Sequence, residues 1–411
     1  MTTDASSNQD KLDLVVFGAT GFAGALVAEY LAERHAGSDL RWGIAGRSEQ
    51  KLKAVRDKLG LQVPMLVADS ADRASLDALA AATTVVCTTV GPYARYGAEL
   101  VAACAAAGTH YCDLTGEAPF IRQMMDAHHE AAVASGARIV NCCGFDSIPS
   151  DLGAWYLQEQ LIARDGAPAE EVRMFLAGMS GGVSGGTIAS MLNILEEASD
   201  PAVRKVLMDP YSLCPEDMRG GPDKRDPMGV TKDPVTGWWG GPFVMAGINS
   251  RVVRRSNALL AHRYGKDFLY SEVTRTSGGP AGAAKAGSIS AGTGAFFGAL
   301  AFPPTRKLLE RFALPSPGEG PSREAIEKGY FKVIHSARTN GKEIGRVTVR
   351  GKRDPGYGAT ACMLGEAAIC LARDPLTSPG GILTPASAMG RELVDRLNKQ
   401  DVTFEFSDAA S

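Results

Sequence analysis

The segment that most constrains the fold of this chain is LDLVVFGATGFAG, residues 12–24. Its apolar beginning has the continuous hydrophobicity of a strand buried on both faces. Three glycines then follow at a spacing of three residues, and a helical pattern begins after them. Glycines at such a turn let the chain bend sharply, let a ligand approach the backbone, and let helix and strand pack closely. The segment predicts a pyrophosphate site at a helix N-terminus. Its predicted cofactor contacts are Gly18, Ala19, Thr20, Gly21, Phe22 and Gly24.

The next predicted strand, residues 41–45, indicates which dinucleotide binds. It runs into Gly46, Arg47 and Ser48, where an NAD-binding unit usually carries an acidic residue for the ribose hydroxyls. A guanidinium and a hydroxyl group suit a 2′-phosphate instead. The sequence therefore predicts NADP(H), with Arg47 and Ser48 as contacts. The alternative is that Arg47 is an ordinary solvated loop residue.

The composition is that of a soluble protein without a surface for nucleic acid. The 411 residues carry a formal net charge of −3, and 45% of them are hydrophobic, so no basic field for a polyanion is expected. Residues 1–10 are polar and predict a disordered tail, with no signal peptide or membrane anchor. Eight cysteines without a CxxC pair, and six histidines without an i,i+4 pair, predict reduced core thiols, no metal site and a cytoplasmic location.

Strand and helix patterns alternate from residue 11 to residue 152, which predicts an α/β domain with a Rossmann-type, doubly wound parallel sheet. Ligands of such sheets lie beyond the C-terminal ends of the strands. Asp69 is placed either to touch adenine or to cap the following helix. The further predicted cofactor contacts at strand ends are Val90, Gly91, Pro92, Tyr93, Gly144 and Phe145.

Residues 153–358 predict a second domain, which opens with another glycine-rich strand-to-helix turn at 180–187. This turn either presents backbone donors to a substrate carbonyl or phosphate, or serves close packing alone. Residues 201–247 are rich in Gly, Pro and Trp and predict a long ordered loop. Further along, Asn340-Gly341 between two strand patterns predicts a β-hairpin with a type I′ turn.

Two other segments of this second domain leave alternatives open. Arg251, Arg254 and Arg255 predict a solvated helix face, or else a receptor for a substrate phosphate. Residues 286–305 contain no charge, although their Gly, Ser and Thr content argues against a membrane span. They predict a buried helix or an apolar lid, with contact to a membrane interface as the alternative.

Seven motifs together resemble the saccharopine dehydrogenase-like oxidoreductases and, within them, the mycobacterial-type trans-acting enoyl reductases. The motifs are GATGFAG at 18–24, AGR at 45–47, VGPYARYG at 90–97, YCDLTGE at 111–117, GFDSIPSDLG at 144–153, SGGTIAS at 184–190 and GGILTPASAMG at 380–390. The resemblance implies an NADP-binding domain at 11–152, an inserted mixed α/β domain at 153–358, and helices at 359–411 that return to the first domain.

The resemblance also implies an activity. Such reductases act in trans on an acyl or polyketide chain that a carrier protein or CoA holds, in cell-envelope lipid assembly, with transient contact to a polyketide synthase. The reaction needs a hydride at the β-carbon and a proton at the α-carbon, and the motifs do not identify the proton donor. The candidate catalytic residues are Tyr93, Asp146 and Ser147. The candidate substrate contacts are Asp113, Ser184, Gly185, Gly186 and Thr187.

The sequence agrees less well with other functions. A short-chain dehydrogenase is disfavoured because no tyrosine has a lysine four residues later. A serine hydrolase using Ser184, in the GVSGG sequence, with His262 or His335 would leave the NADP site without a purpose. The open alternatives are a saccharopine-reductase-like imine oxidoreductase and a non-catalytic NADP-binding scaffold on lipid membranes. A homodimer, and peripheral contact with the inner face of the cell membrane through 286–305, also stay open.

Overall fold

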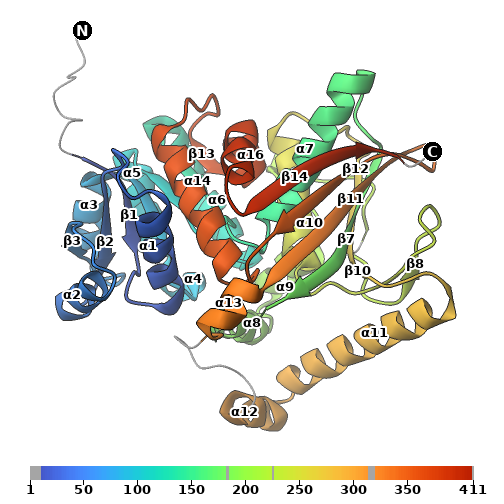
Figure 1. Cartoon of the computed structure of the whole chain (residues 1–411), viewed down its shortest axis with the longest axis horizontal. Helices are drawn as coiled ribbons and strands as arrows, with labels where there is room; N and C mark the ends of the chain where they lie inside the picture. The colour runs from blue at the N-terminus through green and yellow to red at the C-terminus, as the bar shows by residue number, and fades with distance from the viewer. Residues whose placement is uncertain (1–10, 182–184, 225, 313–319, 410–411) are drawn as a thin grey trace.

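The computed structural model describes residues 11–181, 185–224, 226–312 and 320–409. Two seven-stranded sheets organise this part of the chain (Figure 1). The strands of the first sheet all pair in parallel, and β1 lies between β2 and β4. This arrangement confirms the predicted doubly wound α/β fold. The strand order is β13 (Gly381–Leu383), β6 (Arg138–Val140), β5 (His110–Cys112), β4 (Thr83–Thr88), β1 (Leu12–Phe17), β2 (Trp42–Gly46) and β3 (Met65–Val67).

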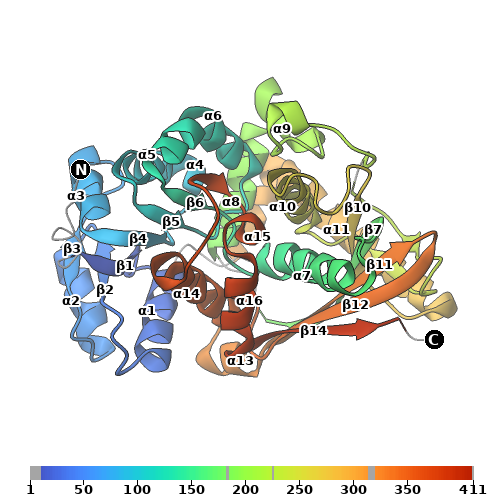
Figure 2. The same cartoon turned by 90° about the horizontal axis from the view of Figure 1, so that it is seen from above.

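Helices cover both faces of the first sheet (Figure 2). One face carries α1 (Phe22–Arg34), α2 (Glu49–Lys58) and α14 (Gly358–Arg373). The other face carries α3 (Arg73–Ala81), α5 (Ala98–Ala107) and α6 (Ala118–Ser135), while the short α4 (Tyr93–Tyr96) follows β4. Because both faces are covered, Leu14, Val15 and Val16 of β1 are all fully buried, as the continuous apolar run requires.

The second sheet is mixed and packs one face against helices α7 (Ile148–Asp165) and α10 (Ala246–Leu259). Only β7 and β10 pair in parallel among its described strands. The strand order is β14 (Val402–Asp408), β12 (Lys342–Gly351), β11 (Tyr330–Thr339), β7 (Glu171–Ser180), β10 (Leu269–Arg275), β9 (Trp239–Gly241) and β8 (Thr231–Lys232). The hairpin prediction is confirmed, since Asn340 and Gly341 join β11 to β12 with φ values of 52° and 70°.

The C-terminal part of the chain contributes to both sheets. Helix α14 packs against α1 and β4, β13 adds a strand to the first sheet, and β14 adds one to the second. The short helices α15 (Pro385–Ala388) and α16 (Gly390–Asn398) contact α7. The sequence predicts that residues 359–411 supply helices to the first domain. In the structure this segment also adds β14 to the sheet of the second domain.

Two expectations for the second domain were wrong. The segment predicted as a loop at 201–247 contains α9 (Pro201–Met208), the 3-10 turn η1 (Glu216–Met218), β8 and β9. The basic cluster predicted on a solvated face is buried within α10, with Arg251, Arg254 and Arg255 exposed by 6%, 3% and 2%. Carboxylates and backbone carbonyls from distant segments accept hydrogen bonds from these guanidinium groups, although Arg255 Nε is buried without a partner among the described residues. Their burial and these contacts disfavour the alternative that they receive a substrate phosphate.

The uncharged segment 286–305 lies in an arm that projects from the molecule (Figure 1). The arm consists of α11 (Gly279–Ala301) and α12 (Pro303–Phe312). Most of α11 is exposed or half-buried, and Phe302 between the two helices is 59% exposed, so the expectation of a buried helix was wrong. None of the helices in the described ranges is long and apolar enough to span a membrane. The lid and the membrane interface stay predictions.

The remaining described helices lie in the chain between strands of the second sheet. Helix α8 (Gly185–Glu197) follows β7 and leads to α9, and α13 (Arg323–Lys328) precedes β11. Serine 184 lies outside the described residues. All eight cysteines are buried free thiols.

Candidate functional site

The glycine-rich turn after β1 forms a backbone cradle at the C-terminal edge of the first sheet. Gly18 has a φ of +92°, and a Cβ atom there would lie 2.8 Å from Val90 Cγ2. A Cβ atom at Gly24 would lie 2.2 Å from the carbonyl oxygen of Gly18. Only glycine at position 24 therefore lets α1 start this close to the turn. The first N–H groups of α1 therefore lie directly at the end of β1, and a helix start at this place favours binding of a pyrophosphate.

The turn after β2 presents an exposed cation beside a helix start. Arg47 is exposed, and it has no hydrogen-bond or ion-pair partner among the described residues. Ser48 caps α2, because its hydroxyl oxygen accepts a hydrogen bond from the Lys51 N–H at 3.4 Å. The Arg47 guanidinium and the Ser48 hydroxyl proton are thus available to a phosphate oxygen.

The ends of β3 and β4 complete the floor of this cradle. Asp69 accepts a hydrogen bond from the Ala71 N–H at 3.0 Å and so closes a turn, whereas Asp72 is the residue that caps α3. At the end of β4, the Thr89 hydroxyl lies 3.4 Å from the Gly18 carbonyl oxygen. The chain beyond β4 therefore touches the glycine turn at the point where strand order reverses, the usual ligand position in such sheets.

A buried glutamate fixes the turn that follows Val90. The Glu117 carboxylate accepts hydrogen bonds from the Tyr93 N–H at 3.0 Å and the Ala94 N–H at 2.9 Å. It also accepts a hydrogen bond from the Ser190 hydroxyl in α8 at 2.7 Å. Glu117 is only 1% exposed, so these three donors replace water around its charge. One carboxylate thereby links the turn of the first domain to helix α8 of the second.

Tyr93 itself is held away from solvent. Its ring packs near Phe120, and its hydroxyl donates a 3.1 Å hydrogen bond to the Thr88 carbonyl oxygen. Burial raises the pKa of Tyr93 well above its usual value. This environment favours a role for Tyr93 in positioning the turn over a role as proton donor.

Asp113 lies in the core between β5 and β6. Its fully buried carboxylate accepts hydrogen bonds from the Tyr111 hydroxyl at 2.8 Å, the Asn141 amide at 2.7 Å and the N–H groups of Thr115 and Cys142 at 3.0 Å. Burial raises the pKa of Asp113 to about 6, although the four donors favour its charged form. Because the protein already occupies its oxygens, this environment favours a role for Asp113 in holding the strand ends over a role in binding substrate.

Asp146 has a different environment at the end of β6. It is half-buried, and no hydrogen-bond partner for its carboxyl group lies among the described residues. Burial raises the pKa of Asp146 to about 6. A carboxyl group that is partly protonated near neutral pH and has no fixed partner is suited to proton transfer.

The residues around Asp146 are held firmly. The Phe145 N–H donates to the Thr360 hydroxyl at 3.0 Å, and the Phe145 ring meets Phe331 of β11 with centroids 4.9 Å apart. The buried Ser147 hydroxyl donates to Asn249 Oδ1 at 3.0 Å, so it is committed to α10. The sequence 144–147 therefore joins the first sheet to the second domain, with Asp146 as its unpaired member within the described ranges.

Helix α8 lies against the turn that Glu117 fixes. Besides Ser190, Asn193 of this helix accepts a 2.9 Å hydrogen bond from Arg95, and Glu196 lies 3.4 Å from the same guanidinium. The helix begins at Gly185, so the predicted contacts Gly185, Gly186 and Thr187 belong to its first turn. The start of the second domain is thus attached to the cofactor edge of the first.

Sequence reasoning did not identify Glu117, Thr89 or Thr360 as site residues. Glu117 is the last residue of the YCDLTGE motif, but the candidate substrate contact from this motif was Asp113. Nothing local distinguishes Thr360, which lies 215 residues from Phe145 in the sequence.

The sequence is similar to those of known proteins. The family model described as Saccharopine dehydrogenase NADP binding domain matches residues 14–140. A trans-acting enoyl reductase of Mycobacterium ulcerans is 40% identical over 97% of this chain and 98% of its own length. A protein of Mycobacterium tuberculosis, provisionally named a trans-acting enoyl reductase, is 44% identical over 98% of this chain and 99% of its own.

A solved structure supports the fold independently. The apo saccharopine dehydrogenase (L-Glu forming) of Saccharomyces cerevisiae aligns over 97% of this chain and 99% of its own, with a TM-score of 0.52. The sequence identity is 14%, so this similarity concerns the fold alone.

Proposed function

We propose that this protein reduces a carbon–carbon double bond of an acyl or polyketide chain. The premise is that the chain belongs to the family of trans-acting enoyl reductases with a saccharopine dehydrogenase NADP-binding domain. Membership makes it an NADP-dependent oxidoreductase. The proposed substrate is held as a thioester on a carrier protein or CoA, presented in transient contact with a polyketide synthase. The proposed setting is cell-envelope lipid assembly in the cytoplasm.

The observation that carries this proposal is the Ser190–Glu117 hydrogen bond. It holds α8 of the second domain against the turn that should face the nicotinamide. A reductase must enclose the cofactor ring and the acceptor carbon between two walls at a separation of about 3 to 3.5 Å. The turn 90–93 supplies one wall, and the start of α8 supplies the other.

The residues fit NADP(H) where a fit can be judged. Gly18 and Gly24 allow α1 to start directly at the end of β1, because Cβ atoms there would collide with Val90, Thr89 and the Gly18 carbonyl oxygen, and a helix start at this place suits a pyrophosphate. The unpaired Arg47 suits the 2′-phosphate. When bound, NADPH supplies the hydride that goes to the β-carbon.

The chain's own residues then have three tasks. Asp146 supplies the proton for the α-carbon, since its carboxyl group has a raised pKa and no fixed partner among the described residues. The positive end of α8, at Gly185 and Gly186, polarises the thioester carbonyl. Glu117 and Ser147 position these groups and touch no reacting atom.

The experiment incubates the purified chain with NADPH and an enoyl chain on a carrier protein, and follows nicotinamide absorbance and product mass. Reduction predicts absorbance loss and a product heavier by two hydrogen atoms. Parallel incubations replace the enoyl chain with an imine formed from a 2-oxo acid and an amino acid. Turnover of the imine alone would contradict the proposal, and so would NADPH binding without turnover of any substrate.

A further inference from the structure

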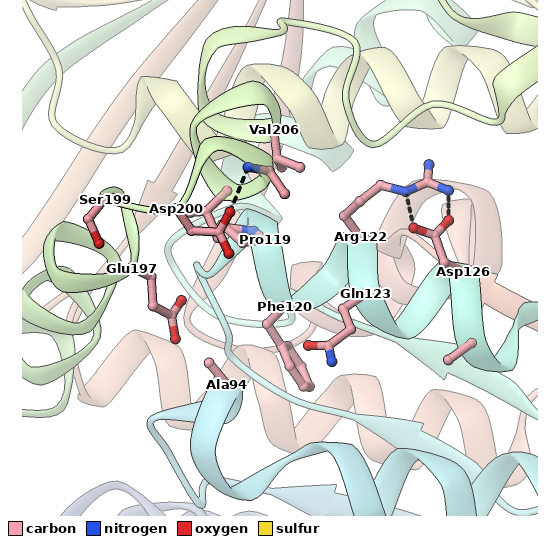
Figure 3. Close-up of a pocket in the computed structure, with 13 residues that line it drawn as sticks. Ala94, Pro119, Phe120, Arg122, Gln123, Asp126, Glu197, Ser199, Asp200 and Val206 are labelled. Carbon is pink, nitrogen blue, oxygen red and sulfur yellow. Dashed lines mark hydrogen bonds and ion pairs between the residues drawn. The ribbon is translucent and has the colours of Figure 1, made fainter.

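A cleft of about 760 Å³ lies between α6 and the segment that joins α8 to α9 (Figure 3). This is the size of a site for a small organic molecule. Its apolar lining comes from Ala94, Pro119 and Phe120 on one side and from Val203 and Val206 on the other. None of these residues belongs to the cofactor cradle.

Helix α9 has no buried residue at all. Its Val203 and Val206 are three positions apart and share one face of the helix, and both line the cleft. Arg204 and Lys205 are exposed. An amphipathic helix normally buries its apolar face against the core, whereas Val206 packs against the core only partly and Val203 is half-buried, so this face stays partly open to the cleft.

The charges around the cleft restrict what fills that space. Asp126, Glu197 and Asp200 line it, and Arg122 is its one cationic lining residue. Arg122 is paired with Asp126 and also donates to the Cys214 carbonyl oxygen. The remaining negative charge disfavours a phosphate or a free carboxylate and permits a neutral, apolar ligand.

The cleft borders the turn that Glu117 holds beside the proposed reaction site. Ala94 lines it, and the Ala94 N–H is one of the donors to Glu117. Helix α8 connects the two places, since Ser190 contacts Glu117 and Glu197 lines the cleft.

We infer that this cleft binds the apolar, distal part of the acyl chain and thereby sets the preferred chain length. The inference rests on the proposed function, because the thioester end of the same chain occupies the reaction site. The anionic part of CoA or of a carrier's phosphopantetheine arm lies outside the cleft, away from its carboxylates.

The test measures binding separately from turnover. Isothermal titration gives the Kd of the NADPH-loaded protein for neutral N-acetylcysteamine thioethers with butyl, octyl and dodecyl chains, which cannot be reduced. Wild-type affinity should rise about fourfold per buried methylene. Val203→Trp fills the cleft, and Val203→Asp adds a charge to it. Lys205→Trp, on the exposed side of the same helix, is the matched control.

Both Val203 variants should lose at least tenfold in dodecyl affinity while butyl affinity and NADPH affinity stay within twofold, and Lys205→Trp should resemble wild type. An unchanged chain-length dependence in both Val203 variants would overturn the inference, and so would the absence of any such dependence in wild type. If the binding pattern holds but no enoyl chain is reduced, the proposed function fails and the cleft assignment stands.

Discussion

Ser190 of the second domain donates a 2.7 Å hydrogen bond to Glu117 of the first, the residue whose carboxylate also binds the N–H groups of Tyr93 and Ala94. The two residues are 73 positions apart in the sequence. Through this contact, the position of α8 depends on the position of the turn at residues 90–94. We therefore expect removal of the Glu117 carboxylate to weaken both NADPH binding and turnover. We expect loss of the Ser190 hydroxyl to lower turnover alone.

Ser190→Ala tests this coupling. The variant keeps the two backbone hydrogen bonds of Glu117, so its Kd for NADPH should stay within about twofold of wild type. Loss of one hydrogen bond to a charged group, about 1.5 to 3 kcal/mol, should lower kcat/KM for an enoyl substrate by about tenfold or more. Glu117→Gln should weaken both NADPH binding and turnover. Ser38→Ala, which removes only local hydrogen bonds with His35 and Leu40 on the exposed surface, is the control. Equal losses in both serine variants would argue against the coupling.

Arg47→Ala tests the choice of cofactor. The exposed guanidinium has no partner among the described residues, so its removal should affect the ligand and not the fold. Loss of one charge-assisted contact should weaken NADPH by about tenfold or more and leave NADH unchanged. Titration of both cofactors measures this, with Lys58→Ala at the far end of α2 as the control. Equal affinity of wild type for NADPH and NADH would refute the assignment.

Asp146→Asn tests the proton donor. Because burial raises the pKa of Asp146 to about 6, the protonated fraction falls about tenfold per pH unit above that value. The kcat/KM of wild type should therefore decline as pH rises through about 6, provided that proton delivery limits the rate. The variant should lose most of its activity and lack this decline, with its Kd for NADPH unchanged. A variant that keeps both wild-type activity and the wild-type pH profile would exclude Asp146 as the donor.

Two other buried carboxyl groups predict how stability changes with pH. Burial raises the pKa values of Asp151 and Glu272 to about 7, and both groups are fully buried in the contact between α7, α10 and β10. The folded protein then binds more protons than the unfolded chain between about pH 4 and pH 7, so the free energy of unfolding falls as pH rises through this window. The fall should be at most about 1.4 kcal/mol per pH unit for each group.

Denaturant titrations from pH 5 to pH 8 measure this dependence. Glu272→Gln keeps the side chain's shape and should remove part of the slope, whereas Glu405→Gln on an exposed strand should leave it unchanged. A pH slope in Glu272→Gln that equals the wild-type slope would contradict the raised pKa of Glu272.

The parts of the fold that depend on local chemistry could be predicted from the sequence. The glycine turn needs positions without a Cβ atom, and the turn at Asn340-Gly341 needs two positive φ values. Both requirements restrict the residue types at a few adjacent positions, so the sequence shows them. Arg254 could not be placed in this way. Its partners Asp223 and Asp226 lie 31 and 28 residues away, and a charged side chain is normally exposed.

The candidate site follows the same division. The turns that we expect to hold the cofactor could be proposed from the sequence because each ends a predicted strand at one edge of a parallel sheet. The role of Glu117 depends on a helix 73 residues further along the chain, and the cleft beside it depends on how α9 packs against α6. Neither arrangement is encoded in a short segment, so neither could be inferred before the two domains were placed together.

The most direct test of the central claim is a labelling experiment. The protein is incubated with NADPH that carries deuterium at nicotinamide C4 on the transferred face and with a carrier-bound enoyl chain, and the product is analysed by mass spectrometry and NMR. The proposed function predicts one deuterium at the β-carbon and one solvent-derived hydrogen at the α-carbon. Deuterium on a carbon that bears nitrogen, or an unlabelled and unreduced chain, would contradict it.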